Sequence, residues 1–303
     1  MKENKTFEMR VFISVVDTGG FTAASHQLVI SQSFVSQTIA NLERRLNVQL
    51  LHRSTRGHRL TWEGEQFLVD CRRILSQIEL AEAQITSAHS KINGELRISA
   101  PLAFGLDQIT QLLPKVMVDH PNVVFHLALS DSTANLIEDK VDIAIRMGIL
   151  SESSLRSRRL CDLQRIIVAA PSYLAIRGTP QKPSDLCRHN CLMWEGPIDH
   201  LNRWPFKVEG ITETPTVNGN FRSDNGLTLF ELCVAGVGVM RLAEHLALPA
   251  IRSGRLVPLL QDYQVNDDSA ISAVFMPGRE LLPRVRNFVD YLVDFFRQPP
   301  WVE

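Results

Sequence analysis

The sequence predicts an α/β multidomain chain in which a small, mainly helical N-terminal domain is joined by one long helix to a larger strand-and-helix domain. Three observations predict this. Apolar residues recur at helical spacing through residues 6–46, and residues 62–90 continue that spacing with no Pro or Gly after Gly64. From Glu95 onward, short strands alternate with helices. A chain of 303 residues is long enough for two or three separate cores.

Within the N-terminal part, residues 21–46 predict two helices joined by a tight turn. Ala23 and Ala24 place small side chains where the helices would cross. Ser31 is a good N-cap for the second helix, because its hydroxyl can accept a free backbone N–H of the first turn. The residues of this second helix that form its predicted buried stripe are Val35, Ile39, Leu42 and Leu46.

The opposite face of this second helix is polar and can face DNA. Short hydrogen-bonding groups come first and arginines follow, as in a helix that reads base edges near phosphates. The residues predicted to contact DNA are Gln32, Ser33, Phe34, Ser36, Gln37, Asn41 and Arg44, with Arg45 on the same polar face. On pattern alone, a purely structural helix-turn-helix with a solvated face is an equal alternative.

Residues 50–61 predict a two-stranded wing with Gly57 at its tip. Arg53, Arg56 and Arg59 crowd around that tip, together with His58. A basic hairpin beside a recognition helix can hold the DNA backbone or place an arginine in a narrow minor groove. The wing therefore favours nucleic-acid binding over the structural alternative, and its three arginines join the predicted contacts.

Residues 7–66 resemble the winged helix-turn-helix of LysR-type transcriptional regulators. The matching residues are Phe12, Phe21, Thr22, Ala23, Ala24, Leu28, Ser31, Gln32, Val35, Ser36, Ile39, Leu42, Glu43, Leu46, Leu50, Leu51, Arg53, Arg56, Leu60, Thr61 and Gly64. The chain departs from the family at Ser33, Phe34 and Gln37, which changes the expected base preference. Asn47 replaces a usual glycine, at a position where asparagine also tolerates positive φ.

Charge and composition agree with a DNA-binding head on an acidic body. Net charge is −1, yet residues 1–62 carry eight Lys and Arg against four Asp and Glu. The start of the chain shows no signal peptide and no run could span a bilayer, so we expect a cytoplasmic protein without membrane contact. The five cysteines show no zinc-ligand spacing. Cys187 and Cys191 are either a redox pair or, as we favour, reduced apolar residues.

Residues 62–90 carry a heptad seam, the pattern of helices that pair. The predicted dimerisation residues are Phe67, Cys71, Ile74, Ile78, Ala81 and Ile85. The alternative is a helix that packs on its own domain. A helix-turn-helix that reads two half-sites needs a dimer, and in the LysR-type family this segment is the dimerisation helix.

The C-terminal part predicts a largely parallel α/β sheet. The expected strands are 96–100, 123–130, 142–147, 158–170, 206–208, 214–221, 237–242, 255–259 and 270–276, and the expected helices are 104–120, 132–140, 226–235, 243–252 and 283–297. Pro114 is expected to kink its helix, and residues 171–173 and 180–205 are expected to be irregular.

This part resembles the effector-binding domain of the same regulators, which is similar to periplasmic solute-binding proteins. Matching segments include 94–101, 141–148, 170–174, 236–239 and 254–258. The resemblance implies domains at 1–62, 63–92 and 93–303. It also implies two subdomains, 94–164 with 268–303 and 165–267, joined by crossing segments near 163–166 and 264–269, with a small molecule bound between them.

A ligand site at the carboxyl ends of the strands also follows from α/β topology. The helix N-termini that come after two of these strands suit an anion. Arg146 is expected either to hold a carboxylate or to pair with an acid of its own subdomain, and Arg241 stands where the family is usually apolar. The predicted effector-binding residues are Ser99, Ala100, Pro101, Leu102, Asp131, Arg146, Trp194, Asn220 and Arg222.

The sequence argues against two other functions. An enzyme would need a nucleophile, metal cluster or phosphate loop, and the sequence shows no such motif. A purely architectural DNA binder would not need the α/β domain. The expectation is therefore a ligand-responsive regulator with no cofactor and no metal. Its expected partners are double-stranded promoter DNA, a small effector, RNA polymerase, and further copies of itself as a homodimer or homotetramer.

Overall fold

The computed structural model describes residues 4–54, 57–86, 92–132, 136, 139–148, 150, 154–196, 199–266 and 269–302. The chain divides into two compact units, the first formed mainly by residues 1–90 and the second by most of the rest. Each unit is described by itself. Within the described residues, no helix is both long enough and apolar enough to cross a membrane.

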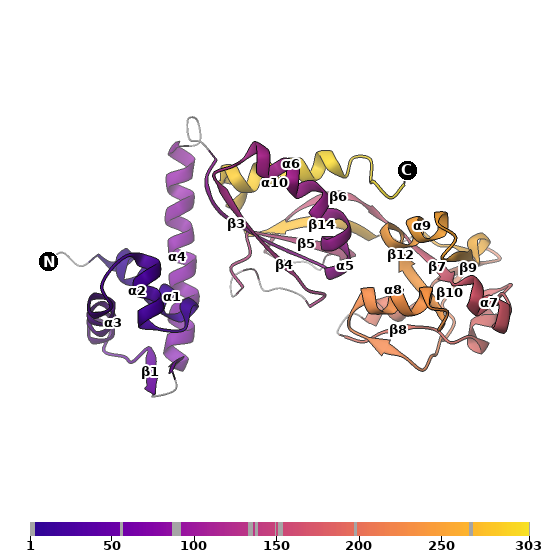
Figure 1. The fold of residues 1–303 in the computed structure, drawn as a ribbon, viewed down its shortest axis with the longest axis horizontal. Coiled ribbons are helices and arrows are strands. Elements are labelled where there is room, and N and C mark those ends of the chain that lie inside the picture. Colours follow the sequence, from indigo (N-terminus) through magenta and orange to yellow (C-terminus); the bar gives the residue numbers. More distant parts are fainter. Residues whose placement is uncertain are drawn as a thin grey trace. The chain divides into compact units, whose positions relative to one another are not determined.

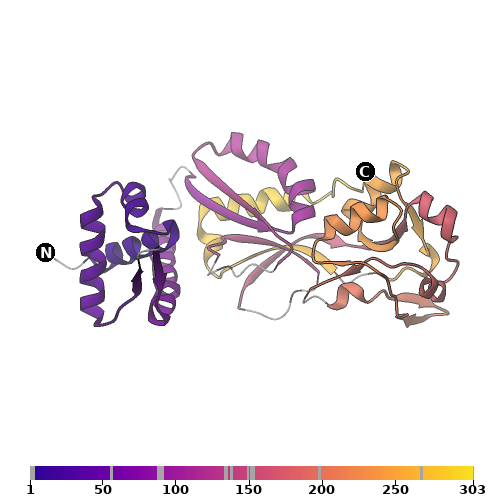
Figure 2. The same ribbon diagram turned by 60° about the horizontal axis from the view of Figure 1, so that its bottom comes forward.

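The first unit is a helical bundle with a two-stranded wing (Figures 1 and 2). Its elements are α1 (Lys5–Thr18), α2 (Phe21–Leu28), α3 (Gln32–Leu46), β1 (Leu51–Ser54), β2 (Gly57–Leu60) and α4 (Trp62–Thr86). The predicted stripe of α3 is confirmed: Val35, Ile39 and Leu42 are fully buried and Leu46 packs against them. They meet Phe12 of α1 and Ala24 of α2 in one apolar core.

Left-handed residues end the first three helices of this unit. Gly19 follows α1 with φ of 77°, as expected of a glycine C-cap. Asn47 follows α3 with φ of 55°, so the predicted tolerance of asparagine for positive φ is confirmed. Val29 ends α2 at φ of 55° and is 89% exposed. A β-branched residue is strained in this conformation.

The start of α4 packs tightly on the wing. A Cβ placed on Gly64 would lie 2.1 Å from the carbonyl oxygen of Leu50, so only glycine allows this approach. Phe67 and Cys71 pack in the core of the unit, with the Phe67 ring 5.6 Å from that of Phe12. The prediction that these two residues lie on a pairing seam is therefore corrected: this part of α4 packs on its own domain.

The second unit contains a five-stranded sheet in the order β4-β3-β5-β14-β6. The strands are β3 (Gly94–Ala100), β4 (Val123–Leu129), β5 (Ile143–Gly148), β6 (Arg156–Leu163) and β14 (Ser269–Phe275). Only the β3–β4 and β3–β5 pairs are parallel, since β14 runs antiparallel to both neighbours. The sheet is mixed, and the prediction of a largely parallel sheet is corrected.

Helices cover one face of this sheet. Figure 1 shows α6 (Thr110–Asp119) and α10 (Pro283–Phe295) side by side, and the Tyr291 hydroxyl donates to the Asp119 carboxylate between them. The short helix α5 (Leu102–Phe104) and a π-helical turn at Gly105–Ile109 precede α6, which contains Pro114. We call the five-stranded sheet with these helices the larger lobe.

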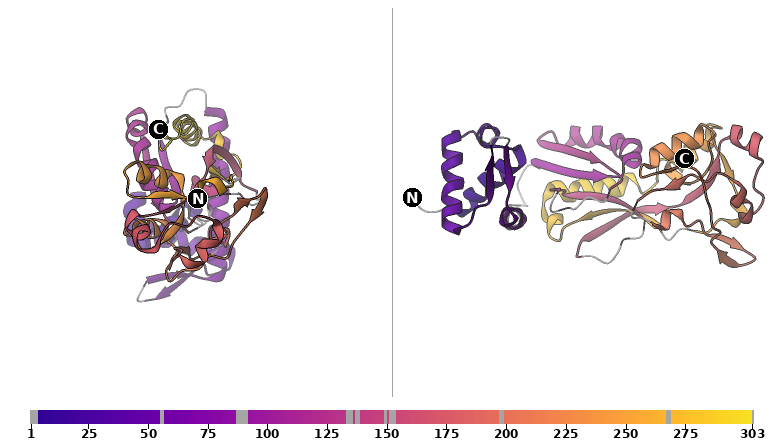
Figure 3. Two further views of the ribbon diagram at one scale, coloured as in Figure 1. Left: turned by 90° about the vertical axis from the view of Figure 1, so that its right-hand side faces the viewer. Right: turned by 90° about the horizontal axis from the view of Figure 1, so that it is seen from below.

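The smaller lobe is built on an antiparallel sheet in the order β12-β7-β13. In the right-hand view of Figure 3 this lobe has the rose to orange colours of residues 165–259. Its strands are β7 (Arg165–Ala169), β12 (Val239–Ala243) and β13 (Val257–Leu259), and its helices are α7 (Pro171–Arg177), α8 (Gly226–Val234) and α9 (Glu244–Arg252). Alternate residues face two cores. Val168 and Leu242 meet α8 and α9, while Ile167 and Val239 face the opposite side with Trp204.

Several predicted elements differ from the structure. The expected strand 158–170 is two strands in different sheets, β6 and β7, divided at Gln164. The expected irregular 171–173 begins α7, because Pro171 occupies its first turn. No described residue of 132–140 is helical. The expected strand 214–221 is irregular, because its segment packs so closely on Cys191 that a Cβ at Gly219 would meet the Cys191 carbonyl oxygen at 1.9 Å.

The remaining chain of the smaller lobe is largely loop, as predicted for residues 180–205. Its short elements are the 3₁₀ turns Pro183–Arg188, Asp199–Asn202 and Gln261–Tyr263 and the strands β8 (Met193–Trp194), β9 (Phe206–Val208), β10 (Ile211–Glu213) and β11 (Arg222–Ser223). A further 3₁₀ turn, Arg279–Leu281, precedes α10.

Candidate nucleic-acid interface and ligand cavity

The polar face of α3 is exposed and bonded within itself. The Ser31 hydroxyl caps the helix by accepting the N–H of Phe34 at 3.2 Å. The Asn41 side-chain oxygen accepts from Gln37 Nε2 at 2.8 Å and from Arg44 Nη1 at 2.9 Å. These weak surface contacts orient the side chains while leaving them accessible to a DNA base or phosphate.

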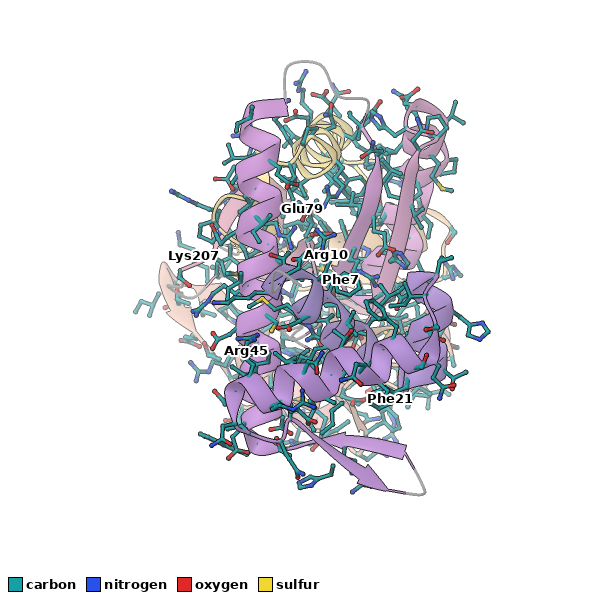
Figure 4. The ribbon with its side chains drawn as sticks, turned by 90° about the vertical axis from the view of Figure 1, so that its left-hand side faces the viewer. Phe7, Arg10, Phe21, Arg45, Glu79 and Lys207 are labelled. Carbon is teal, nitrogen blue, oxygen red and sulfur yellow. The ribbon has the colours of Figure 1, made fainter. Side chains whose placement is uncertain are left out.

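Phe34 and Arg45 belong partly to the scaffold. The Phe34 ring lies 5.8 Å from that of Phe7 and is 42% exposed. Arg45 donates two hydrogen bonds to Glu8 Oε2, at 2.6 and 3.1 Å. Figure 4 shows Arg45 on α3, with α1 behind that helix. Arg45 therefore fastens α3 to α1, while its place near phosphate stays a prediction.

The predicted wing is present as an antiparallel pair with Ser54 opposite Gly57. Of its three predicted arginines, Arg59 is exposed on β2. Arg53 lies on β1 opposite His58, but its side chain is outside the described part of the chain, as is all of Arg56. Glu43 holds the wing to α3 by accepting the N–H groups of Leu50 and Leu51.

The second unit encloses a cavity of about 210 Å³ lined by both lobes. The larger lobe contributes the end of β3, the loop after β4, and β5, and the smaller lobe contributes β8, α8, β12 and α9. Apolar side chains form most of the lining, including Phe104, Leu192, Trp204, Leu229 and Met240. This is the usual composition of a small-molecule site: an apolar wall with a few polar groups.

Two carboxylates connect the lobes at the cavity. Asp131 accepts the N–H of Leu102 at 2.9 Å and, across the lobes, the N–H of Gly226 at the start of α8 at 3.1 Å. Asp107 lies 3.3 Å from Nδ1 of His245, which is 2% exposed. The predicted anion site at the helix N-terminus after β3 is therefore already occupied by the protein's own carboxylate.

Most of the predicted effector residues meet at this cavity. Ser99, Ala100, Pro101, Asp131, Arg146 and Trp194 line it. Leu102 does not line it, and its N–H is bound to Asp131. Asn220 and Arg222 are exposed elsewhere, because the irregular 214–221 segment follows Cys191 and Met193 and does not extend to the cavity.

Sequence reasoning missed several lining residues of the smaller lobe, namely Arg165, Leu192, Asn202, Leu229, Met240 and His245. Their positions carry no local signal, since each is one residue within an ordinary strand, helix or loop. Arg241 also lines the cavity, and in the sequence it stands out only by its departure from the family. Burial lowers the pKa of Arg146, which indicates that this cation is held in a poorly solvated place.

The cysteines favour the apolar interpretation. Cys191 is buried and its Sγ donates to the Leu186 carbonyl, whereas Cys187 is exposed. Burial raises the pKa of Cys191 to about 12 and that of Cys233 to about 12. Both thiols are thus protonated near neutral pH and are poor nucleophiles.

The fold and the two surfaces define a class: a winged helix-turn-helix protein with a two-lobed small-molecule domain. Residues 7–65 match the family model "Bacterial regulatory helix-turn-helix protein, lysR family", and residues 89–297 match "LysR substrate binding domain". The chain belongs to the family of LysR-type transcriptional regulators. These regulators bind DNA and small-molecule effectors and form oligomers, and they are not enzymes.

Two related regulators match this sequence over nearly its whole length. The regulator CrgA of Neisseria meningitidis serogroup C (strain 8013) is 35% identical over 294 residues, which are 97% of each protein. The activator AaeR of Escherichia coli (strain K12) is 33% identical over 291 residues, 95% of this chain and 93% of that protein.

Solved structures show the same organisation. The structure of CrgA from Neisseria meningitidis has 34% identity and a TM-score of 0.64, and the match covers 98% of this chain and 99% of that one. The full-length Vibrio cholerae virulence activator AphB has 26% identity and a TM-score of 0.62, with 96% and 99% covered.

Proposed function

We propose that the protein controls transcription by binding promoter DNA through α3 and the wing, and that a small effector in the cavity regulates this binding. The observation that carries the proposal is that one cavity is lined by both lobes. A ligand that contacts both lobes binds most tightly to one arrangement of them, and it shifts the protein toward that arrangement by its difference in affinity.

The proposed DNA contacts come from α3 and the wing. On α3 they are the exposed Gln32, Ser33, Phe34, Gln37 and Arg44 and the half-buried Ser36 and Asn41, and in the wing they are Arg53, Arg56 and Arg59. Polar groups near the start of α3 would read bases, while Arg44 would approach the backbone. The domain limits inferred above, at residues 62 and 92, remain part of the proposal. RNA polymerase is the further partner through which a promoter-bound regulator would act.

Pairing of two chains through α4 is also proposed. After Phe67 and Cys71 are assigned to the core, Ile74, Ile78, Ala81 and Ile85 remain, and Ile74 is 40% and Ile85 is 85% exposed. Ile78→Glu would place a charge in the middle of this seam. A halved mass in light scattering is the expected result, and an unchanged mass would exclude α4 as the main dimer contact.

DNA binding is tested on the region upstream of the protein's own gene, over a salt series. We expect the wild type to prefer this DNA over unrelated DNA, with a steep salt dependence. Arg44→Ala should make the slope of log affinity against log salt shallower by about one. Arg73→Ala is the matched control, because Arg73 is an exposed arginine of α4 paired with Asp70. No preference over unrelated DNA at any salt would contradict the proposal.

A further inference from the structure

The side chains of Gln37, Asn41 and Arg44 form a hydrogen-bonded row along the polar face of α3. They are spaced by four and by three residues, which places them on consecutive turns of one face of the helix. The Asn41 side-chain oxygen accepts from Gln37 Nε2 at 2.8 Å and from Arg44 Nη1 at 2.9 Å. Gln37 and Arg44 are exposed, and Asn41 between them is half-buried. Two side chains of the proposed DNA-binding face are thus held by a third.

The chemistry of arginine sets the direction of these bonds. A guanidinium has N–H donors and no acceptor, so Arg44 can bond only to the oxygen of the Asn41 amide. The same oxygen faces Gln37, which must then present its NH₂ group to Asn41 and not its own oxygen. Arg44 therefore fixes the orientation of the Asn41 amide, and Asn41 in turn fixes that of the Gln37 amide.

The Gln37 amide keeps two groups for a ligand. Asn41 takes one N–H of Nε2, which leaves the other N–H as a donor and Oε1 as an acceptor beside it. Among the bases, adenine presents the complementary pair in the major groove, with the acceptor N7 next to the donor N6–H₂. The orientation of Gln37 therefore matches the major-groove edge of adenine.

Guanine does not match this pair of groups, because its major-groove edge carries two acceptors, N7 and O6. A glutamine amide that rotates freely can turn its NH₂ group toward both acceptors. An amide that is held by Asn41 keeps Oε1 beside its outward N–H and would place Oε1 against O6. The hydrogen bond from Gln37 to Asn41 should therefore increase the discrimination between adenine and guanine.

The helix under this row is held in place. Val35 and Ile39 are fully buried in the core of the first unit, and Arg45 is bonded to Glu8 of α1. With the backbone of α3 fixed on its inner side, the outer side chains are left with rotation about their own bonds. Asn41 restricts that rotation for Gln37, as the residues that support a precise contact are expected to do.

We propose that Gln37 reads an adenine in the major groove, and that Asn41 is the positioning residue that makes this contact selective for adenine over guanine. This inference rests on the proposed binding of promoter DNA through α3. It gives neighbouring residues of that face different roles: Gln37 touches the base, and Asn41 acts on the base through Gln37. The remaining N–H groups of Arg44 are available to a phosphate.

The base preference is tested with full-length protein, by selecting bound sequences from randomised duplex DNA and measuring affinities for the selected site. Gln37→Ala should lose the preference at one base pair of a half-site, an A·T pair for the wild type, and retain the others. Replacing this pair by G·C should weaken wild-type binding at least about fivefold, as for the loss of one bidentate base contact. Gln37→Arg should prefer G·C there, because the guanidinium matches N7 and O6 of guanine.

Gln66→Ala is the matched control, because Gln66 is exposed on α4, outside the proposed DNA-binding face. It should leave both the affinity and the preferred sequence unchanged. If Gln37→Ala keeps the wild-type preference at every base pair, or loses it at a G·C pair, the proposal is overturned.

The positioning role is tested with the ratio of the affinities for the A·T and G·C forms of the site. Asn41→Ala should lower this ratio about twofold to tenfold, the range of one hydrogen bond. Asn41→Asp should keep the ratio, since its carboxylate still accepts from both neighbours, although its charge weakens binding to both forms. If Asn41 is merely structural, Asn41→Ala changes both affinities by the same factor, and an unchanged ratio overturns the assignment.

Arg44→Ala is a second variant in case Asn41→Ala does not fold. It frees the Asn41 amide to turn, so the ratio should fall here too. A selection that enriches no sequence with the wild type would contradict the proposed DNA-binding function, and this inference with it. An enriched sequence with no A·T pair that depends on Gln37 would contradict only the present inference.

Discussion

The first unit and the lobes around the cavity are held together by different kinds of contact. In the first unit, α1, α2, α3 and the start of α4 share a continuous apolar core, and backbone atoms approach closely at Gly64. At the cavity, the lobes meet through carboxylates on a backbone N–H and on a histidine, with one ring contact between Phe104 and His245 at 5.3 Å beside them. Packing in a core changes shape reluctantly, whereas a few polar links can be exchanged for contacts with a ligand. This difference is consistent with a rigid first unit and with lobes of the second unit that can change their arrangement.

The largest expected effect is on the packed unit. Gly64→Ala places a Cβ 2.1 Å from the Leu50 carbonyl oxygen, where backbone cannot move aside easily. We expect the free energy of unfolding of this unit to fall by about 3 kcal/mol, as in an overpacked core. Urea unfolding followed by circular dichroism measures it. Gly20→Ala is the control, since nothing lies within 4 Å of its added Cβ, and a similar loss in both variants would contradict the explanation.

The next effect concerns the polar link of the lobes. Asp131→Asn leaves one oxygen to accept two N–H groups, so either Leu102 or Gly226 loses its partner. We expect the unfolding free energy of the second unit to fall by about 2 kcal/mol. Thermal unfolding measures the change. Asp294→Asn is the control, because Asp294 pairs with Arg297 at the surface and its side chain is 70% exposed. It should change the unfolding free energy by less than about 1 kcal/mol. Equal effects would show that Asp131 does not hold the lobes.

Arg44 and Arg45 are adjacent in α3, but we expect Arg45 to contribute to stability and Arg44 to contribute to DNA binding. Arg45→Ala removes both hydrogen bonds to Glu8, whose side chain is 13% exposed, so we expect a loss of about 1–2 kcal/mol in unfolding free energy. Arg44→Ala should leave stability within about 0.5 kcal/mol and should weaken DNA binding instead. Urea titration and a DNA-binding assay on both proteins give the comparison. The assignment of roles fails if the two variants behave alike.

The smallest expected effect is a gain in the unfolding free energy of the first unit. Val29 ends α2 in a left-handed conformation and its side chain is exposed, so its contacts offset little of the strain. Val29→Gly should stabilise the first unit by up to about 1 kcal/mol, reduced by the greater freedom of glycine in the unfolded chain. Val48→Gly, at an exposed position outside the left-handed residues, should not stabilise it. The midpoint of urea unfolding measures the change. A midpoint for Val29→Gly that is equal to or below that of the wild type would contradict the explanation that Val29 is strained.

The same contrast explains what the sequence could predict. The helices, the stripe of α3 and the C-cap at Asn47 follow from local spacing and local conformational preference, and they were predicted. The cavity depends on which strands become neighbours. Arg165 and Arg241 are 76 residues apart in number and meet only through the β7–β12 register. Asn220 and Arg222 were misplaced for the same reason, because their segment packs beside Cys191 and not beside the cavity.

The heptad pattern of α4 identifies one apolar face whose two parts have different surroundings. The heptad spacing from Phe67 to Ile85 is regular along the sequence. Its first members pack on Phe12 and the rest of the core, while Ile74 and Ile85 remain exposed. Periodicity identifies the apolar face of a helix, but only the neighbouring elements decide what each part of that face contacts.

The tryptophans give the protein its own optical reporter of the cavity. Trp194 and Trp204 line the cavity, whereas Trp62 is 72% exposed at the start of α4 and Trp301 lies in the C-terminal segment. Indole emission depends on the polarity and charge around the ring, so an occupant of the cavity would alter its intensity and wavelength. Libraries of small molecules could then be screened by fluorescence with unlabelled protein, and a Trp62→Phe variant would lower the constant background.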